Sequence, residues 1–150
     1  MVATLRNRVL SEKVLEEYQE FILPKFSKMD GMKIAIDPGN GAAAGVASLL
    51  FEKMGAEVKT INNEPDGRFP NRPSEPSAKN LKGLSEMIEK GNFDFGIGFD
   101  GDADRIIMCD EKGKIIDGDQ IIGMLARRWK SKKILKGGVI GTLMSNYGLE

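Results

Sequence analysis

Three aspartates alternate with small residues in the segment Asp100-Gly-Asp-Ala-Asp-Arg105, which we call the carboxylate loop. Carboxylates crowded in this way repel one another, and a divalent cation relieves the repulsion by taking one oxygen from each. Oxygen ligands favour Mg²⁺, Mn²⁺ or Ca²⁺ over zinc, and three of them leave positions that a phosphate oxygen can fill. Arg105 adds a cation that can hold a phosphate through two hydrogen bonds. The loop therefore predicts a metal site suited to phosphoryl transfer, with Asp100, Asp102 and Asp104 as ligands.

Two other interpretations of the carboxylate loop stay open at this point. A solvated polar turn needs no ligand, although the loop follows a predicted core strand, where α/β sheets hold their sites. An EF-hand is the more specific rival, because counting Asp100 as position one puts Asp102 and Asp104 at positions three and five and Glu111 at position twelve. Position six is Arg105 instead of the required glycine, and the flanking segments predict strands. The metal site for phosphoryl transfer is therefore favoured.

The remaining composition narrows the chemistry further. The chain contains no histidine, and Cys109 is its only cysteine. These absences exclude histidine-based triads, histidine-ligated zinc and an internal disulfide, so carboxylates must carry any metal chemistry. Cys109 is interpreted as a small core residue, because no histidine is present to activate it.

The charge balance and hydropathy indicate what the chain does not bind. Lys plus Arg and Asp plus Glu both number 22, which gives no net field to attract nucleic acid or an anionic membrane. The longest nearly apolar stretch, Ala42 to Phe51, is too short to span a bilayer, and the segment from Met1 to Leu10 lacks a signal-peptide core. We therefore expect a soluble, cytoplasmic chain whose partner is a small molecule.

The elements that must position the carboxylate loop follow a strand, helix, strand pattern, which predicts a parallel pair of strands. Hydrophobic spacing and turn residues place the elements of the first half. They are a helix over 11–23, capped by Ser11 and ended by Pro24, a strand over 32–37, a helix over 42–54 and a strand over 56–61.

The glycines between the first strand and the second helix resemble a dinucleotide-binding turn. Their spacing differs from that motif, since Gly39, Gly41 and Gly45 run as G-x-G-x-x-x-G, and Glu64 matches the required acidic residue only loosely. Tight turning and helix packing are favoured over ligand contact.

The second half repeats the step from helix to strand after a proline-rich loop. Phe93, Phe95, Ile97 and Phe99 alternate with Asp94 and two glycines, so we expect a neighbour to pack closely on the glycine face. The predicted elements are a loop over 62–77, a helix capped by Ser77 and ending near Gly91, a strand over 93–99, a hairpin of strands 106–109 and 114–116, a helix from Asp117 to about Lys130, and a strand over 138–144.

The predicted fold class is therefore α/β, with a mixed, largely parallel sheet flanked by helices. A chain of 150 residues can bury one ordinary core, so we expect one complete domain and a truncated second.

Three segments together resemble, in order and spacing, the second domain of the α-D-phosphohexomutase superfamily, which includes phosphoglucomutase, phosphomannomutase and phosphoglucosamine mutase. They are Asp37-Pro-Gly-Asn-Gly41, Asp66-Gly-Arg-Phe-Pro-Asn71 and Phe99-Asp-Gly-Asp-Ala-Asp-Arg105. The resemblance implies a linking helix over 1–30, the metal-binding domain over 31–116 and the start of the third domain over 117–150. It also implies that Asp100, Asp102 and Asp104 ligate Mg²⁺ and that Arg105 lies beside the phosphate.

The resemblance implies a reaction that moves phosphate between the 6- and 1-positions of a hexose or hexosamine phosphate. An enzyme phosphoserine and a sugar bisphosphate carry the phosphoryl group, while Mg²⁺ neutralises its charge. This chain has no phosphoserine loop of the Ser-His-Asn-Pro type and no histidine-bearing sugar loop, so we expect the chain alone to be inactive. Missing domains or a complementary chain would supply both loops. The alternative is a stand-alone, non-catalytic module that binds Mg²⁺ or phosphate.

The motifs do not agree on which sugar phosphate is the substrate. Asp117-Gly-Asp-Gln120 and Gly141-Thr-Leu-Met-Ser-Asn146 look like phosphoglucosamine mutases, whereas Asp66-Gly-Arg-Phe-Pro-Asn-Arg-Pro73 looks more like phosphomannomutase/phosphoglucomutase enzymes. The first assignment is slightly favoured.

Overall fold

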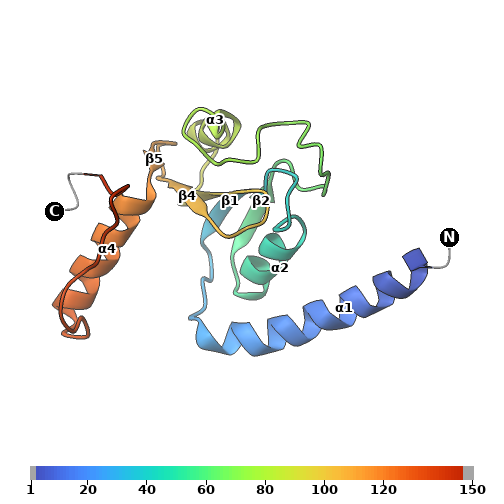
Figure 1. Cartoon of the computed structure of the whole chain (residues 1–150), viewed down its shortest axis with the longest axis horizontal. Coiled ribbons are helices and arrows are strands. Elements are labelled where there is room, and N and C mark those ends of the chain that lie inside the picture. The colour runs from blue at the N-terminus through green and yellow to red at the C-terminus, as the bar shows by residue number, and fades with distance from the viewer. Residues whose placement is uncertain (1–2, 147–150) are drawn as a thin grey trace.

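The computed structural model describes residues 3–146, and for residues 3–12 the backbone alone. One sheet of five strands, in the order β2-β1-β3-β4-β5, forms its centre (Figure 1). The elements in chain order are α1 (Ala3–Ile22), the 3-10 helix η1 (Leu23–Lys25), β1 (Lys33–Asp37), α2 (Val46–Lys53), β2 (Glu57–Thr60), α3 (Lys82–Lys90), β3 (Phe95–Phe99), β4 (Ile106–Cys109), β5 (Ile115–Ile116) and α4 (Gly118–Ser131).

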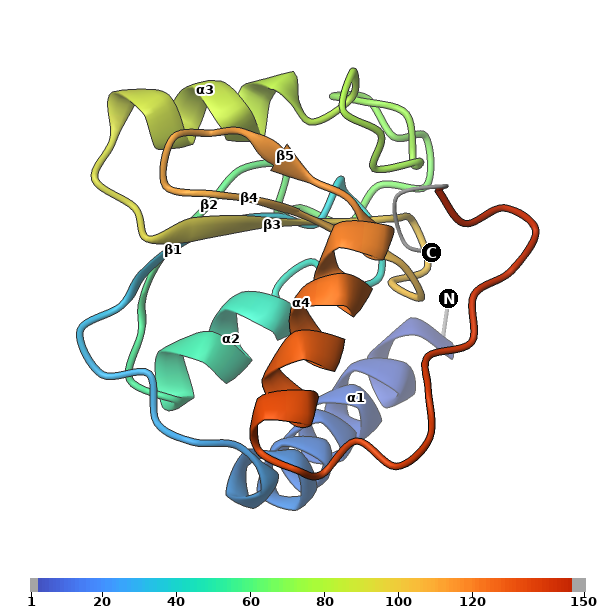
Figure 2. The same ribbon diagram turned by 90° about the vertical axis from the view of Figure 1, so that its left-hand side faces the viewer.

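The sheet is mixed, as the sequence predicts. Strand β1 pairs in parallel with β2 and β3, whereas the pairs β3–β4 and β4–β5 are antiparallel. Helix α3 covers one face of the sheet and α2 the other (Figure 2). The α/β fold class and the hairpin before α4 are confirmed. Asp37 pairs with Gly98 in the register, so the carboxyl ends of β1 and β3 lie side by side.

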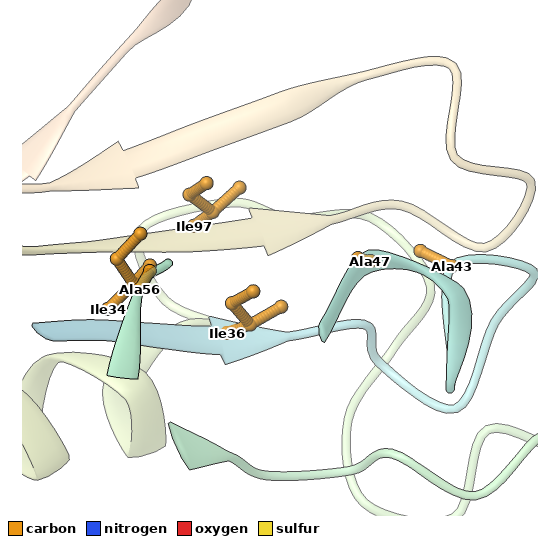
Figure 3. Packing of buried hydrophobic residues seen from close by; sticks show 6 residues of the cluster. All are labelled: Ile34, Ile36, Ala43, Ala47, Ala56 and Ile97. Atoms are coloured by element: carbon orange, nitrogen blue, oxygen red, sulfur yellow. The ribbon is translucent and has the colours of Figure 1, made fainter. Parts of the chain in front are cut away.

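The face of the sheet toward α2 carries the larger of two apolar clusters. Its isoleucines come from alternate positions of β1 and from β3, and small alanines let α2 approach closely (Figure 3). The buried members are Ile34, Ile36, Ala43, Ala47, Ala56 and Ile97.

On the opposite face of the sheet, helix α3 and the residue before it pack directly against the glycines of β3, which have no side chains. A Cβ on Gly96 would lie 2.5 Å from Cδ1 of Ile88, and a Cβ on Gly98 would overlap the side chain of Leu81. The predicted close packing on the glycine face of β3 is therefore confirmed, and α3 supplies it. Cys109 is buried in the same cluster, in line with its interpretation as a core residue.

Two predicted helix starts are wrong. Helix α1 begins at Ala3, because residues 3–10 contain neither glycine nor proline, so Ser11 lies inside the helix and not at its N-cap. Helix α3 begins at Lys82 with no side-chain cap, because the carbonyl of Ser77 accepts the N–H groups of Asn80 and Leu81 in a preceding turn.

Two further boundaries differ from the sequence prediction. Helix α2 begins at Val46 instead of residue 42, because Gly45 has a left-handed φ of 74° and residues 41–45 form turns. The predicted strand over 138–144 is wrong, since a strand needs a hydrogen-bonded neighbour and the five-stranded sheet pairs nothing with this segment.

The helix predicted from Asp117 is confirmed. Asp117 caps α4 by accepting the N–H of Gln120 at 2.8 Å, and Gln120 accepts the N–H of Asp117 in return. Within residues 3–146, no helix combines the length and apolar character needed to cross a bilayer.

Candidate metal site

The carboxylate loop is the turn that joins the antiparallel strands β3 and β4. The N–H of Asp100 donates to the carbonyl of Arg105 at 3.3 Å, and the N–H of Ala103 donates to the carbonyl of Asp100 at the same distance. Ala103 has a φ of 64°, in the left-handed region that short side chains tolerate better than branched ones. The turn is therefore compact enough to direct its alternate side chains to one place.

The three aspartates of the loop converge. Asp100, Asp102 and Asp104 each offer one carboxylate oxygen, and these oxygens lie within 4.8 Å of one another. In an octahedron with bonds of about 2.1 Å, neighbouring ligand oxygens lie about 3.0 Å apart and opposite ones about 4.2 Å apart, so the carboxylates would draw together around a bound Mg²⁺. The donor set, three hard anionic oxygens, fits a hard divalent cation.

The three carboxylates have different surroundings. Asp100 is only 2% exposed, whereas Asp102 and Asp104 are open to solvent. Asp100 accepts the backbone N–H and the Nε–H of Arg105, each at 3.0 Å. One carboxylate is therefore held in place by the protein, and the other two are free to adjust to a bound ion.

Proton sharing between carboxylates separates their pKa values. Burial tends to raise the pKa of Asp100, but hydrogen bonds from the Arg105 backbone, from Asp104 and from the Arg105 side chain outweigh it and lower that pKa. The hydrogen bond with Asp100, reinforced by the charge of Asp102, raises the pKa of Asp104. A divalent cation at this place would neutralise the same charges.

Arg105 lies at the rim of the site. Its Nη1 is 2.7 Å from Oε2 of Glu75, its Nε is 3.5 Å from Oδ1 of Asp104, and its side chain is 59% exposed. The hydrogen bond with Asp100 and the charge of Glu75 raise the pKa of Arg105. The guanidinium is therefore a permanent cation that solvent, or a phosphate, can reach.

Two other segments press on the backbone of the loop. Ala42 donates its N–H to the carbonyl of Gly101 at 2.9 Å, and a Cβ on Gly41 would lie 2.5 Å from that same oxygen. On the other side, a Cβ on Gly101 would lie 2.9 Å from the ring of Phe69. Gly41 and Gly101 therefore permit a close stack of three chain segments, and packing accounts for the glycine at position 41.

A buried ion pair lies directly behind the loop. Nε of Arg72 is 2.8 Å from Oδ2 of Asp37, and the two side chains are only 4% and 1% exposed. The other oxygen of Asp37 accepts the N–H of Gly39 at 2.8 Å and the side-chain amide of Asn62 at 3.0 Å. This network fastens the proline-rich loop to the carboxyl end of β1.

The structure brings together all four site residues predicted from the sequence, namely Asp100, Asp102, Asp104 and Arg105. The EF-hand interpretation is wrong, because strands β3 and β4 flank the loop and Glu111 lies in the next turn, between β4 and β5. Asp100 is buried and paired with Arg105, so it does not belong to a freely solvated turn, whereas Asp102 and Asp104 are exposed to solvent.

Four residues around the site were missed by the sequence interpretation: Asp37, Phe69, Arg72 and Glu75. A signal was present, since Asp37 ends one predicted strand and Asp100 directly follows another, and carboxylates that become buried need cationic partners. The arginines of the proline-rich loop were the available cations on that side of the sheet.

Comparison with known proteins agrees with this architecture. Residues 16–113 match the family model described as phosphoglucomutase/phosphomannomutase, alpha/beta/alpha domain II. The chain is 51% identical over 128 residues to the phosphoglucosamine mutase of Pelagibacter ubique, covering 85% of this chain and 28% of that protein. It is 46% identical over 137 residues to the phosphoglucosamine mutase of Thermodesulfovibrio yellowstonii, covering 89% and 30%.

A solved structure extends the likeness to three dimensions. The phosphoglucomutase/phosphomannomutase family protein of Burkholderia thailandensis superposes with a TM-score of 0.73 at 30% identity, covering 80% of this chain and 26% of that one. The chain thus spans less than a third of the length of these relatives. The resemblance drawn from the three motifs is confirmed, and the chain belongs to the phosphoglucomutase/phosphomannomutase family, with its domain II at residues 16–113.

Proposed function

We propose that this chain is the metal-binding domain of a phosphohexomutase, which moves phosphate between the 6- and 1-positions of a hexosamine or hexose phosphate. The observation that carries the proposal is the convergence of Asp100, Asp102 and Asp104, whose oxygens lie within 4.8 Å of one another. Three carboxylates at this separation repel one another unless protons or a cation intervene.

Asp100 is the ligand that sets the position of the site. Its burial and its two hydrogen bonds from Arg105 leave it a single orientation, so one ligand is in place before a cation arrives. Asp102 and Asp104 would close on the ion from the solvent side. A bound Mg²⁺ would supply charge neutralisation for a phosphoryl group in transfer.

Arg105 is the residue of this chain that we assign to the phosphate itself. Its guanidinium has a planar fork of donors that matches two phosphate oxygens, and its exposed position beside the carboxylates leaves that fork accessible. Glu75 and Asp100 hold the fork from two sides, which limits its freedom before substrate binds. The nucleophilic phosphoserine and the sugar contacts are expected in domains outside this sequence.

The names of the relatives support a hexosamine phosphate as substrate. Both relatives described above, at 51% and 46% identity, are phosphoglucosamine mutases. The preference agrees with the motifs at 117–120 and 141–146, whereas the segment 66–73 resembles enzymes acting on mannose and glucose phosphates.

Titration calorimetry with Mg²⁺ and Mn²⁺ tests the metal site in the chain as it stands. We expect weak binding to the unmutated chain, because the phosphate that completes the shell is absent, and at least about tenfold weaker binding to Asp102→Asn. The matched control is Glu111→Gln, an equal loss of charge at the exposed turn between β4 and β5, which should bind like the unmutated chain. Equal affinity in the unmutated chain and Asp102→Asn would contradict the proposal.

A further inference from the structure

The guanidinium of Arg72 uses all of its donors on fixed acceptors inside the protein. Nε–H donates to Oδ2 of Asp37 at 2.8 Å, and Nη2 donates to the carbonyl oxygens of Asp37 at 3.2 Å and Phe99 at 2.6 Å. Nη1 donates to the carbonyls of Pro73 at 3.0 Å and Ser74 at 3.3 Å. A guanidinium has five N–H donors, and each has a partner here.

The bond to Phe99 reaches the last peptide group before the carboxylate loop. The carbonyl of this Phe99–Asp100 peptide accepts from Arg72, and its N–H donates to the carbonyl of Arg105 at 3.3 Å. Because a peptide group is planar, holding it at both its oxygen and its nitrogen fixes its orientation. The direction in which Asp100 leaves β3 is therefore determined from both sides.

The charge of the buried guanidinium is neutralised away from the loop. Arg72 forms its ion pair with Asp37, at the carboxyl end of the neighbouring strand β1. The charge of Asp100 is therefore not neutralised by Arg72. Asp100 instead pairs with Arg105. Arg72 thus holds the backbone just before the loop, and Arg105 holds the carboxylate of Asp100.

We propose that Arg72 is a positioning residue of the metal site, which fixes the Phe99–Asp100 peptide and with it the buried ligand Asp100. The inference rests on the proposed function, since it requires that the carboxylate loop binds a divalent cation. It adds a residue outside the loop, on the proline-rich segment, that sets how well the ligands are arranged.

The first test is the Mn²⁺ affinity of Arg72→Lys, measured by electron paramagnetic resonance. Lysine keeps a cation beside Asp37 but has no planar fork to reach Phe99, Pro73 and Ser74 as well. We expect a folded variant with about tenfold weaker Mn²⁺ binding, the range typical for loss of a group that orients a ligand. The matched control is Arg68→Lys on the same segment, whose side chain is 87% exposed and pairs with Asp66. This control should bind Mn²⁺ like the unmutated chain.

Urea unfolding of each variant without metal measures its stability, so that a loss of Mn²⁺ affinity can be distinguished from a loss of folding. A folded Arg72→Lys that binds Mn²⁺ like the unmutated chain would overturn the role of Arg72. If Arg72→Lys does not fold, the Asp37→Asn/Arg72→Gln double variant, which buries no unpaired charge, is judged by the same affinity criterion.

A nuclear magnetic resonance measurement on the unmutated chain needs no variant. Adding Mg²⁺ should shift the Nε–H signal of Arg72 and leave that of Arg68 in place. An unmoved Arg72 signal, while the amides of residues 100–105 shift, would overturn the proposal. Equal Mn²⁺ affinity of the unmutated chain and Asp102→Asn would instead overturn the metal site, and the role of Arg72 with it.

Discussion

The backbone N–H of Ala42 donates to the carbonyl oxygen of Gly101 at 2.9 Å, although the two residues lie 59 positions apart in the sequence. This contact joins the turn after β1 to the carboxylate loop after β3. It requires a bare backbone at Gly41, because a Cβ there would lie 2.5 Å from the same oxygen. The turn after β1 therefore supports the carboxylate loop through packing.

Replacing Gly41 by alanine should destabilise the chain by about 1–3 kcal/mol, because the added methyl overlaps backbone that cannot move aside cheaply. Thermal unfolding monitored by circular dichroism measures the effect. Gly118→Ala is the control, since a Cβ at Gly118 meets no atom within 4 Å. Equal unfolding temperatures for Gly41→Ala and the unmutated chain would show that the contact is looser than described.

As the pH is lowered, the affinity for Mg²⁺ should begin to fall at a higher pH than it would if all three aspartates had ordinary pKa values. The pKa of Asp104 is raised by its hydrogen bond with Asp100, so as pH falls a proton occupies the site before the usual aspartate range is reached. The charged form binds the cation, and affinity is therefore full above the raised pKa and lost below it. Calorimetric titrations with Mg²⁺ between neutral pH and about pH 4 test this. An affinity that stays constant over that range would contradict it.

Cys109 should be inert in the folded chain. Burial, with the nearby charges of Asp110 and Asp37, raises the pKa of the thiol to about 11, so about one thiol in a thousand is ionised at pH 8. We expect the reaction with dithiobis(nitrobenzoate) to be at least about a hundred times slower than in urea. Comparable rates in the folded and unfolded chain would show that the core opens around β4.

The order of helices and strands could be predicted because hydrophobic spacing and turn residues are local signals. The carboxylate loop is equally local, since its three aspartates are two residues apart in sequence. The ion pair of Asp37 with Arg72 joins positions 35 residues apart, and its geometry depends on the path of the proline-rich loop. The segment 138–144 shows the converse, because its strand-like composition has no neighbouring strand to pair with.

The chain alone should not interconvert glucosamine, mannose or glucose phosphates, even with Mg²⁺ and a sugar bisphosphate present. Phosphoryl transfer depends on holding nucleophile, phosphate and metal together, and this chain holds none of the expected serine or sugar loops. A coupled assay measures turnover. Activity that appears only with a second chain carrying those loops would support the account, whereas turnover by the chain alone would require a different nucleophile.

The central claim is that Asp100, Asp102 and Asp104 bind a divalent cation, and a Mg²⁺ titration followed by nuclear magnetic resonance at each residue tests it most directly. We predict that the shifts concentrate in residues 100–105 and extend to the segments that contact them, residues 41–42 and 69–75. In Asp102→Asn the same shifts should need at least about ten times more Mg²⁺. Shifts centred on the turn around Asp110 and Glu111, or no shifts at all, would contradict the account.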